Sequence, residues 1–107
     1  MYSVSALSTE YLLIPVAATE QGITVNPTTQ SVDVAATVQG AEPLSGDWKS
    51  AAWESDTTDA DSPVYSARLL IGPAGVLTLT AGVYELWLRV TDNPEVVVRR
   101  AQSLWVF

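Results

Sequence analysis

Apolar and polar residues alternate along much of this chain, and this two-residue period is the feature that most constrains its fold. The clearest case is GVYELWLRVTD (82–92), where Tyr84, Leu86, Leu88 and Val90 share one parity. Side chains of a β-strand point to opposite faces in turn, so one face of such a segment can be buried. SVDVAATV (31–38) and VYSARLLI (64–71) follow the same pattern, and no segment shows a convincing helical period. The chain is therefore predicted to be all-β.

Turn residues separate these stretches about every 8–15 residues, which is typical of an antiparallel sandwich. A length of 107 residues fits one domain. We predict a single antiparallel β-sandwich of about seven strands over 10–107, with VLTLT (76–80) among the strands. The last strand is expected to return along 82–92 with a break near Ala101 and Gln102. The polar residues 1–9 are predicted to be a flexible N-terminal arm that orders on binding.

A glycine two residues before a tyrosine opens the longest alternating stretch, at Gly82 and Tyr84. This arrangement resembles the tyrosine corner of immunoglobulin-like (Ig-like) sandwiches, in which the tyrosine hydroxyl bonds back to nearby backbone. The resemblance implies an Ig-like fold. The cysteine pair of antibody domains is missing, so a variant Ig-like family is implied.

Composition excludes several classes of function. The chain has no cysteine and no histidine, which removes disulfides, thiolate metal sites and the commonest general base. Its formal net charge of −7 repels phosphate backbones, so we expect no direct binding of nucleic acid. The apolar run 11–18 is interrupted by Pro15; it is too short to span a membrane and lacks the basic flank of a secretory signal. We expect synthesis in a cytoplasm and no membrane partner.

Carboxylates are the remaining candidates for chemistry. Glu54, Asp56, Asp59 and Asp61 lie close together and could hold calcium, but they do not follow the pattern of an EF-hand loop. A solvated turn is the favoured interpretation, with no metal and no cofactor. A glycosidase-like carboxylate pair would need a cleft, and the acids fall mostly at strand ends and in loops. The chain is therefore predicted not to be an enzyme.

Tryptophan and arginine are the candidates for binding. Trp48 and Trp53 are five residues apart, so a regular strand places them on opposite faces, one in the core and one exposed. Alternation places Trp87 opposite to Leu86 and Leu88, and Trp105 opposite to Leu104 and Val106. Arg99 and Arg100 are adjacent, so only one of them can join Arg89 on a given face. An exposed set of tryptophan and arginine is typical of protein–protein hot spots. The predicted partner-binding residues are Trp87, Arg89, Arg99 and Trp105.

Two alternatives stay open for these residues. Two or three of the tryptophans could belong to the core, and the arginines could make ordinary cross-strand pairs with Glu85 or Glu95. Exposed rings could also stack on sugars. A coplanar set of tryptophans with polar neighbours would favour sugar, and a tryptophan ringed by arginine and aliphatic side chains would favour protein.

Three strings carry a further resemblance: GDW (46–48), LIGPAG (70–75) and RVTDNPEVVVRR (89–100). Over 10–107 the chain resembles small Ig-like virion structural proteins of actinobacterial tailed phages and prophages. That family has no catalytic motif to transfer. The resemblance implies a non-enzymatic virion protein, in capsid decoration or in the head–tail connection, that contacts capsid, neck or tail proteins and can form homo-oligomers on the virion lattice. The alternative is an Ig-like glycan-binding or adhesive module.

Overall fold

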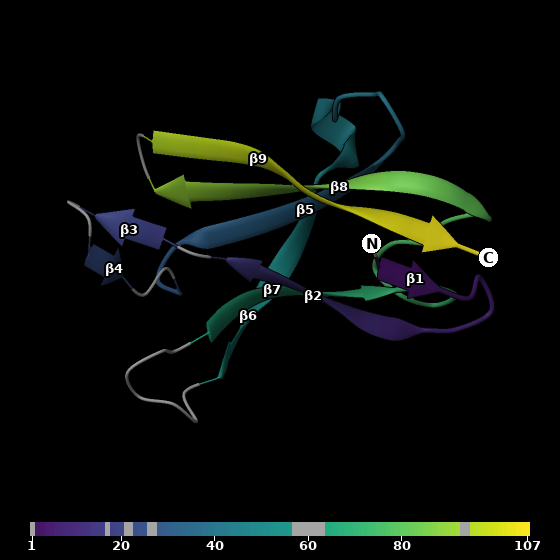
Figure 1. The fold of residues 1–107 in the computed structure, drawn as a ribbon, viewed down its shortest axis with the longest axis horizontal. Helices are drawn as coiled ribbons and strands as arrows, with labels where there is room; N and C mark the ends of the chain where they lie inside the picture. The colour runs from purple at the N-terminus through teal and green to yellow at the C-terminus, as the bar shows by residue number, and fades with distance from the viewer. Residues whose placement is uncertain (1, 17, 21–22, 26–27, 57–63, 93–94) are drawn as a thin grey trace.

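The chain is all-β in its computed structural model, which describes residues 2–16, 18–20, 23–25, 28–56, 64–92 and 95–107 (Figure 1). This confirms the all-β part of the prediction, whereas the sheet described below is mixed and not purely antiparallel. Within these residues, nine strands and one short 3₁₀ turn follow in the order β1 (Tyr2–Val4), β2 (Glu10–Val16), β3 (Ala18–Glu20), β4 (Ile23–Val25), β5 (Ser31–Val38), η1 (Ser45–Asp47), β6 (Lys49–Asp56), β7 (Val64–Ile71), β8 (Gly82–Asp92) and β9 (Glu95–Val106).

Seven of these strands form one mixed sheet in the order β1-β9-β8-β5-β6-β7-β2, while β3 and β4 pair only with each other. Neighbours are antiparallel except β1, which runs parallel to β9. Strand β6 changes partner: residues 49–51 pair with β5, and residues 52–56 pair with β7. The sheet therefore curls at β6 into a nearly barrel-like form, with β5, β8 and β9 on one side and β2 and β7 on the other (Figure 1).

The two ends of the curled sheet, β1 and β2, meet through a side chain. The hydroxyl of Tyr2 donates a hydrogen bond of 2.5 Å to the backbone carbonyl of Leu13. This bond satisfies a carbonyl on the outer edge of β2 and holds the N-terminal strand against it.

Alternating residues from both sides of the curl fill the interior. Leu86, Leu104 and Val34 are the largest fully buried side chains, and they come from β8, β9 and β5. Burying one such side chain contributes roughly 1.5–3 kcal/mol. The alternation predicted for 64–71 and 82–92 is confirmed, and the interior cluster comprises Val4, Leu12, Ile14, Val32, Val34, Ala67, Leu69, Ile71, Leu86, Leu88, Leu104 and Val106.

The N-terminal residues are part of this core rather than a flexible arm. Strand β1 pairs with residues 104–106 of β9, and Val4 is buried. Beyond the strand, the amide of Phe107 donates to the carbonyl of Val4, and the amide of Ala6 donates to the carbonyl of Phe107. The prediction for residues 1–9 is thus wrong for the described residues 2–9, because a pattern of three residues is too short to recognise when its partner lies at the far end of the sequence.

The structure differs from the predicted strands at residues 76–80 and refines the prediction near Ala101. Residues 76–80 alternate but form no strand; they make a single bridge, between Leu77 and Ile71. The expected break near Ala101 is a β-bulge inside a continuous β9, because the register shifts between Leu86, which pairs with Gln102, and Trp87, which pairs with Arg100.

The tyrosine-corner hydrogen bond is present. The hydroxyl of Tyr84 donates to the backbone carbonyl of Thr80 at 2.8 Å. This contact ties the start of β8 to the segment before it, as the resemblance at Gly82 and Tyr84 implies.

The turn after β7 packs against the segment that follows β1. Gly72 has φ +115°, a conformation that side chains other than hydrogen rarely allow. A Cβ at this position would lie 2.0 Å from the carbonyl oxygen of Ser8. The hydroxyl of Thr9 donates to the carbonyl of Pro73, and so the two segments are joined directly.

We therefore expect Gly72→Ala to lower the free energy of unfolding by at least about 2 kcal/mol, because the methyl group adds both backbone strain and a collision with Ser8. Gly46→Ala is the matched control, since no atom lies within 4 Å of its added Cβ and its φ is not positive. Urea unfolding of both variants measures the difference. Equal stabilities for the two variants would contradict this account of the turn.

Candidate docking face on strands β5, β8 and β9

The outward side of β5, β8 and β9 carries most of the predicted binding residues. Cross-strand partners lie on the same face of a sheet, so the register defines which residues are neighbours. From one end of this docking face to the other, the rows are Asp33–Arg89–Val98, Ala35–Trp87–Arg100, Thr37–Glu85–Ser103 and Val83–Trp105.

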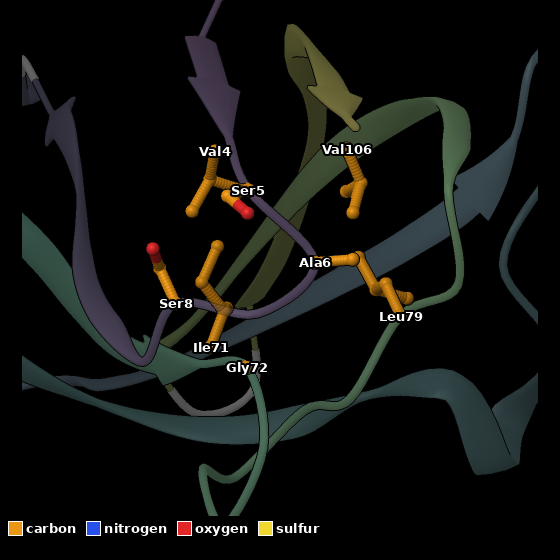
Figure 2. A pocket seen from close by; sticks show the side chains of 8 residues that line it. All are labelled: Val4, Ser5, Ala6, Ser8, Ile71, Gly72, Leu79 and Val106. Carbon is orange, nitrogen blue, oxygen red and sulfur yellow. The ribbon is translucent and has the colours of Figure 1, made fainter.

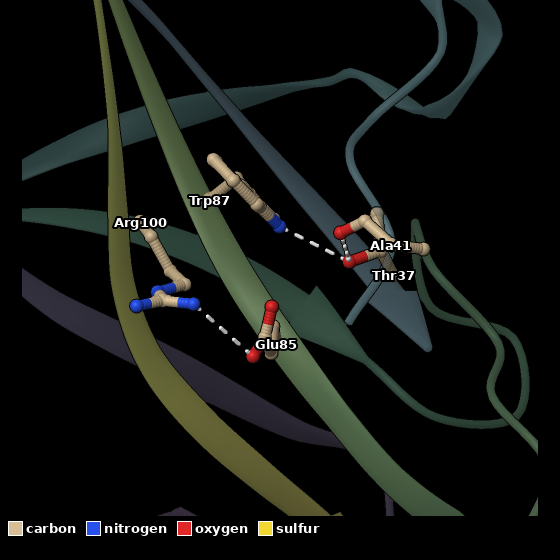
Figure 3. Close-up of polar contacts among 5 residues, drawn as sticks. All are labelled: Thr37, Ala41, Glu85, Trp87 and Arg100. Atoms are coloured by element: carbon tan, nitrogen blue, oxygen red, sulfur yellow. Dashed lines mark hydrogen bonds and ion pairs between the residues drawn. The ribbon is translucent and has the colours of Figure 1, made fainter. Parts of the chain in front are cut away.

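Trp87 lies in the middle of this face and is half-buried. Its indole Nε1 donates to the hydroxyl of Thr37 at 3.0 Å, and that hydroxyl donates to the carbonyl of Ala41 at 3.0 Å (Figure 3). The indole covers the outward side of β5, where Thr37 and Ala35 are both buried. Trp87 is therefore a rigid part of the face, and its removal would cost stability as well as contact surface.

Arg89 is held from two sides. Its Nε and Nη2 lie 3.0 and 2.9 Å from Oδ2 of Asp33. Its guanidinium carbon also lies 4.6 Å from the centre of the Trp48 ring, within the range of a cation–π contact. These contacts attach the segment before β6 to the sheet, and they place a cation over one face of the Trp48 ring.

Arg100, rather than Arg99, shares the face with Arg89. Arg100 pairs across the strands with Trp87 and lies 3.5 Å from a carboxylate oxygen of Glu85 (Figure 3). Arg99 pairs with Leu88 and so lies on the opposite face, where its Nη1 donates to the carbonyl of Val98. The grouping of Arg99 with Trp87 and Arg89 is thus corrected. The adjacent arginines do split between the faces, but alternation alone cannot say which one goes where.

Trp105 is the most open tryptophan of the face, with 47% of its surface exposed. It pairs with Val83, and its ring centre lies 5.1 Å from that of Phe107 at an angle of 47°. Val83 and Phe107 are exposed as well. Trp105 and Trp87 share a face but are separated by the row that contains Glu85. They form two anchor points rather than one continuous patch.

The other two tryptophans are not placed by the predicted strand alternation, because Trp48 precedes β6 and neither ring is fully buried or fully exposed. Trp53 lies on β6, packs against the core and donates from Nε1 to the carbonyl of Gln30 at 2.8 Å. Trp48 lies outside the core, but it is half-buried beneath Arg89 and not fully exposed. Trp48 and Asp33 were not predicted as part of the face. The negative charge of Asp33 and the aromatic ring of Trp48 both suit Arg89. The strand register brings Asp33 to Arg89, and only the three-dimensional packing brings Trp48 there.

Two further features bear on catalysis or ligand binding, namely clusters of metal-binding side chains and pockets. Among the described residues, no three histidine, cysteine, aspartate or glutamate side chains come together as a metal site. Asp59 and Asp61 of the acidic stretch lie outside the described residues. Figure 2 shows a small pocket between Val4, Ile71, Leu79 and Val106. It has room for about one water molecule (≈ 10 Å³) and is lined mainly by apolar atoms.

The chain matches no protein-family model, no curated protein and no solved structure. No helix among the described residues is long and apolar enough to cross a membrane. What the chain does is therefore inferred from the docking face and from the resemblance of the three strings in its sequence.

The two arginines of the face are expected to respond differently to lysine. Arg89→Lys should lower the free energy of unfolding by about 1 kcal/mol, because an ammonium group cannot keep both contacts to Asp33 while lying over Trp48. Arg100→Lys should stay within about 0.5 kcal/mol of the parent, because this side chain is 64% exposed and its ion pair is long. Urea unfolding distinguishes the two variants, and equal effects would show that the Asp33–Arg89–Trp48 contacts add no stability.

Proposed function

We propose that this chain is a non-enzymatic protein-interaction module that serves as a virion structural protein of tailed phages. The observation that carries the proposal is the docking face on β5, β8 and β9. It combines anchored side chains, Trp87 and Arg89, with exposed apolar ones at Val98 and Trp105. Rigid aromatic and arginine anchors surrounded by aliphatic side chains are typical of protein–protein hot spots, because they bind with little loss of conformational freedom.

The arrangement of the rings favours a protein over a sugar. A sugar-binding platform needs open, roughly coplanar ring faces. Arg89 lies over one face of Trp48, the indole of Trp87 is tied to Thr37, and the ring of Trp105 is tilted against that of Phe107. An Ig-like glycan-binding or adhesive module is the second candidate, and the exposed Trp105 and Phe107 rings are the specific observation in its favour.

The virion role is supported by where the resembling strings fall in the fold. GDW (46–48) ends at Trp48 beneath Arg89, and LIGPAG (70–75) forms the turn at Gly72. The described part of RVTDNPEVVVRR (89–100) belongs to β8 and β9. The resembling strings thus coincide with the docking face and with the turn that holds the N-terminal segment. The acidic net charge of −7 also suits a part that must not bind packaged nucleic acid.

An Ig-like architecture is the finer fold that we propose with this function. The tyrosine-corner bond of Tyr84 is one support. The change of partner along β6 is another, since β5 and β7 pair with different parts of β6 and both contribute side chains to the same core. In this view β6 belongs to both layers of the sandwich.

Phage particles assembled without this chain provide the direct test. Purified chain should co-sediment with them, and Trp105→Ala should weaken the binding about tenfold, because an exposed anchor is lost without disturbing the core. Tyr11→Ala is the matched control: it removes an aromatic side chain of 61% exposure from β2, outside the docking face, and should leave binding unchanged.

Circular dichroism would establish that both variants keep the β fold. Equal binding by the two variants would show that the docking face is not the contact. If the parent chain fails to co-sediment but binds oligosaccharides, and Trp105→Ala abolishes that binding, the glycan-binding function replaces the one proposed.

A further inference from the structure

The edge of β9 away from β8 is open over most of its length. Strand β1 covers only residues 104–106 on that side, and no other strand of the described residues pairs there. The open stretch begins with Val96, Val97 and Val98, and two of these, Val96 and Val98, are exposed. A row of unpaired backbone groups flanked by β-branched side chains is a template for another strand.

This edge carries a charge pattern that is complementary to itself. The sequence Glu95-Val96-Val97-Val98-Arg99 has an acid two residues before Val97 and a base two residues after it. Two identical strands that pair antiparallel are related by a two-fold axis. Each residue of one strand then lies opposite the residue of the other strand that is equally far from the axis in sequence, on its other side. Opposite charges then meet across the interface when the axis passes through Val97.

The alternatives are restricted by geometry. Cross-strand partners lie on the same face, so a two-fold axis perpendicular to the sheet must pass through a residue and not between two residues. An axis at Val98 would place Arg99 against Val97 and Arg100 against Val96, without a pair of opposite charges. An axis at Arg99 would bring two arginines together. Among these centres, Val97 alone gives charge complementarity.

We propose that two copies of this chain pair antiparallel through the open edge of β9, with Val97 on the two-fold axis. Val96 then packs against Val98 of the second copy on one face, and Arg99 lies opposite Glu95 of the second copy on the other. Arg99 is available for this role, because it is exposed and none of the ion pairs among the side chains that the structure describes includes it. The bulge at Ala101 lies just beyond the paired stretch, where the strand departs from regular pairing. Val98 also borders the docking face, so the pairing would bring the docking faces of the two copies side by side; the pairing itself is argued from the strand edge and not from what that face binds.

Single cysteines test the axis directly, since the chain has no cysteine of its own. In Val97→Cys the two Cα atoms would be about 4.5–5.5 Å apart, within the range that a disulfide spans. Under a mild oxidant we expect this variant to form covalent dimer at least about tenfold faster than Val96→Cys, which would face position 98 of the second copy. Exposure alone predicts the reverse order, because Val96 is 52% exposed and Val97 is half-buried. Equal rates, or a faster Val96→Cys, would overturn the proposal.

Charge exchange tests the register in the reduced chain, by sedimentation equilibrium at about 0.15 M salt. Arg99→Glu should raise the dimer dissociation constant about tenfold or more, because two attractive pairs become repulsive. Adding Glu95→Arg should restore the constant to within about threefold of the parent. Arg100→Glu is the matched control; it changes the same charge one residue away and should have little effect.

A parent chain that stays monomeric at about 1 mM, or a double variant that fails to recover dimerisation, would overturn the proposal. Trp105→Ala should leave dimerisation unchanged, which separates a failure at the β9 edge from a failure of the docking face. Circular dichroism of each charge variant shows whether a loss of dimer reflects a loss of fold.

Discussion

Strand β6 pairs with β5 at its beginning and with β7 at its end, and the rest of the structure depends on this change of partner. A sheet of seven strands that continued flat would leave both faces of every strand in water, including the apolar one. Because β6 turns from one side to the other, the apolar faces of β5, β8 and β9 meet those of β2 and β7. The alternating pattern then finds a common interior, and Tyr2 joins the two ends of the curl at Leu13.

The curl also determines which surface is left for partners. With one face of β5, β8 and β9 used for the core, the other face carries Trp87 and Arg89, and both are held by side chains of the same sheet. Asp33 and Thr37 have no role in the interior. They orient the two larger side chains, so the docking face is already ordered before anything binds.

Much of this fold follows from local patterns in the sequence. Alternation identifies the strands at 31–38, 64–71 and 82–92, and the resemblance at Gly82 and Tyr84 implies a hydrogen bond that spans only four residues. What escapes prediction is non-local. Residues 76–80 alternate without becoming a strand, because alternation does not supply a neighbouring strand to pair with.

The candidate site likewise could be predicted where it depends on local alternation and could not where it depends on contacts between distant segments. Trp87 and Arg89 could be placed on the outward face of β8 by counting residues, because they alternate with Leu86 and Leu88. Trp105 could be placed outward on β9 in the same way, because it lies between Leu104 and Val106. Choosing between Arg99 and Arg100 required the register of β8 against β9, and recognising Trp48 and Asp33 required the contacts of Arg89. The strand at Tyr2–Val4 was missed because its partner is the other end of the sequence.

The parallel pairing of β1 with β9 has a mechanical consequence. A pull on Tyr2 toward the start of the chain and a pull on Val106 toward its end act in opposite directions along two strands that lie side by side. The load then falls on all the bonds of the ladder at once, including those of Val4 and Ala6 with Phe107. Bonds loaded in shear must break together, whereas a hairpin pulled from its open end is unzipped one bond at a time. Tension between Tyr2 and Val106 is therefore met by a ladder loaded in shear before it reaches the core.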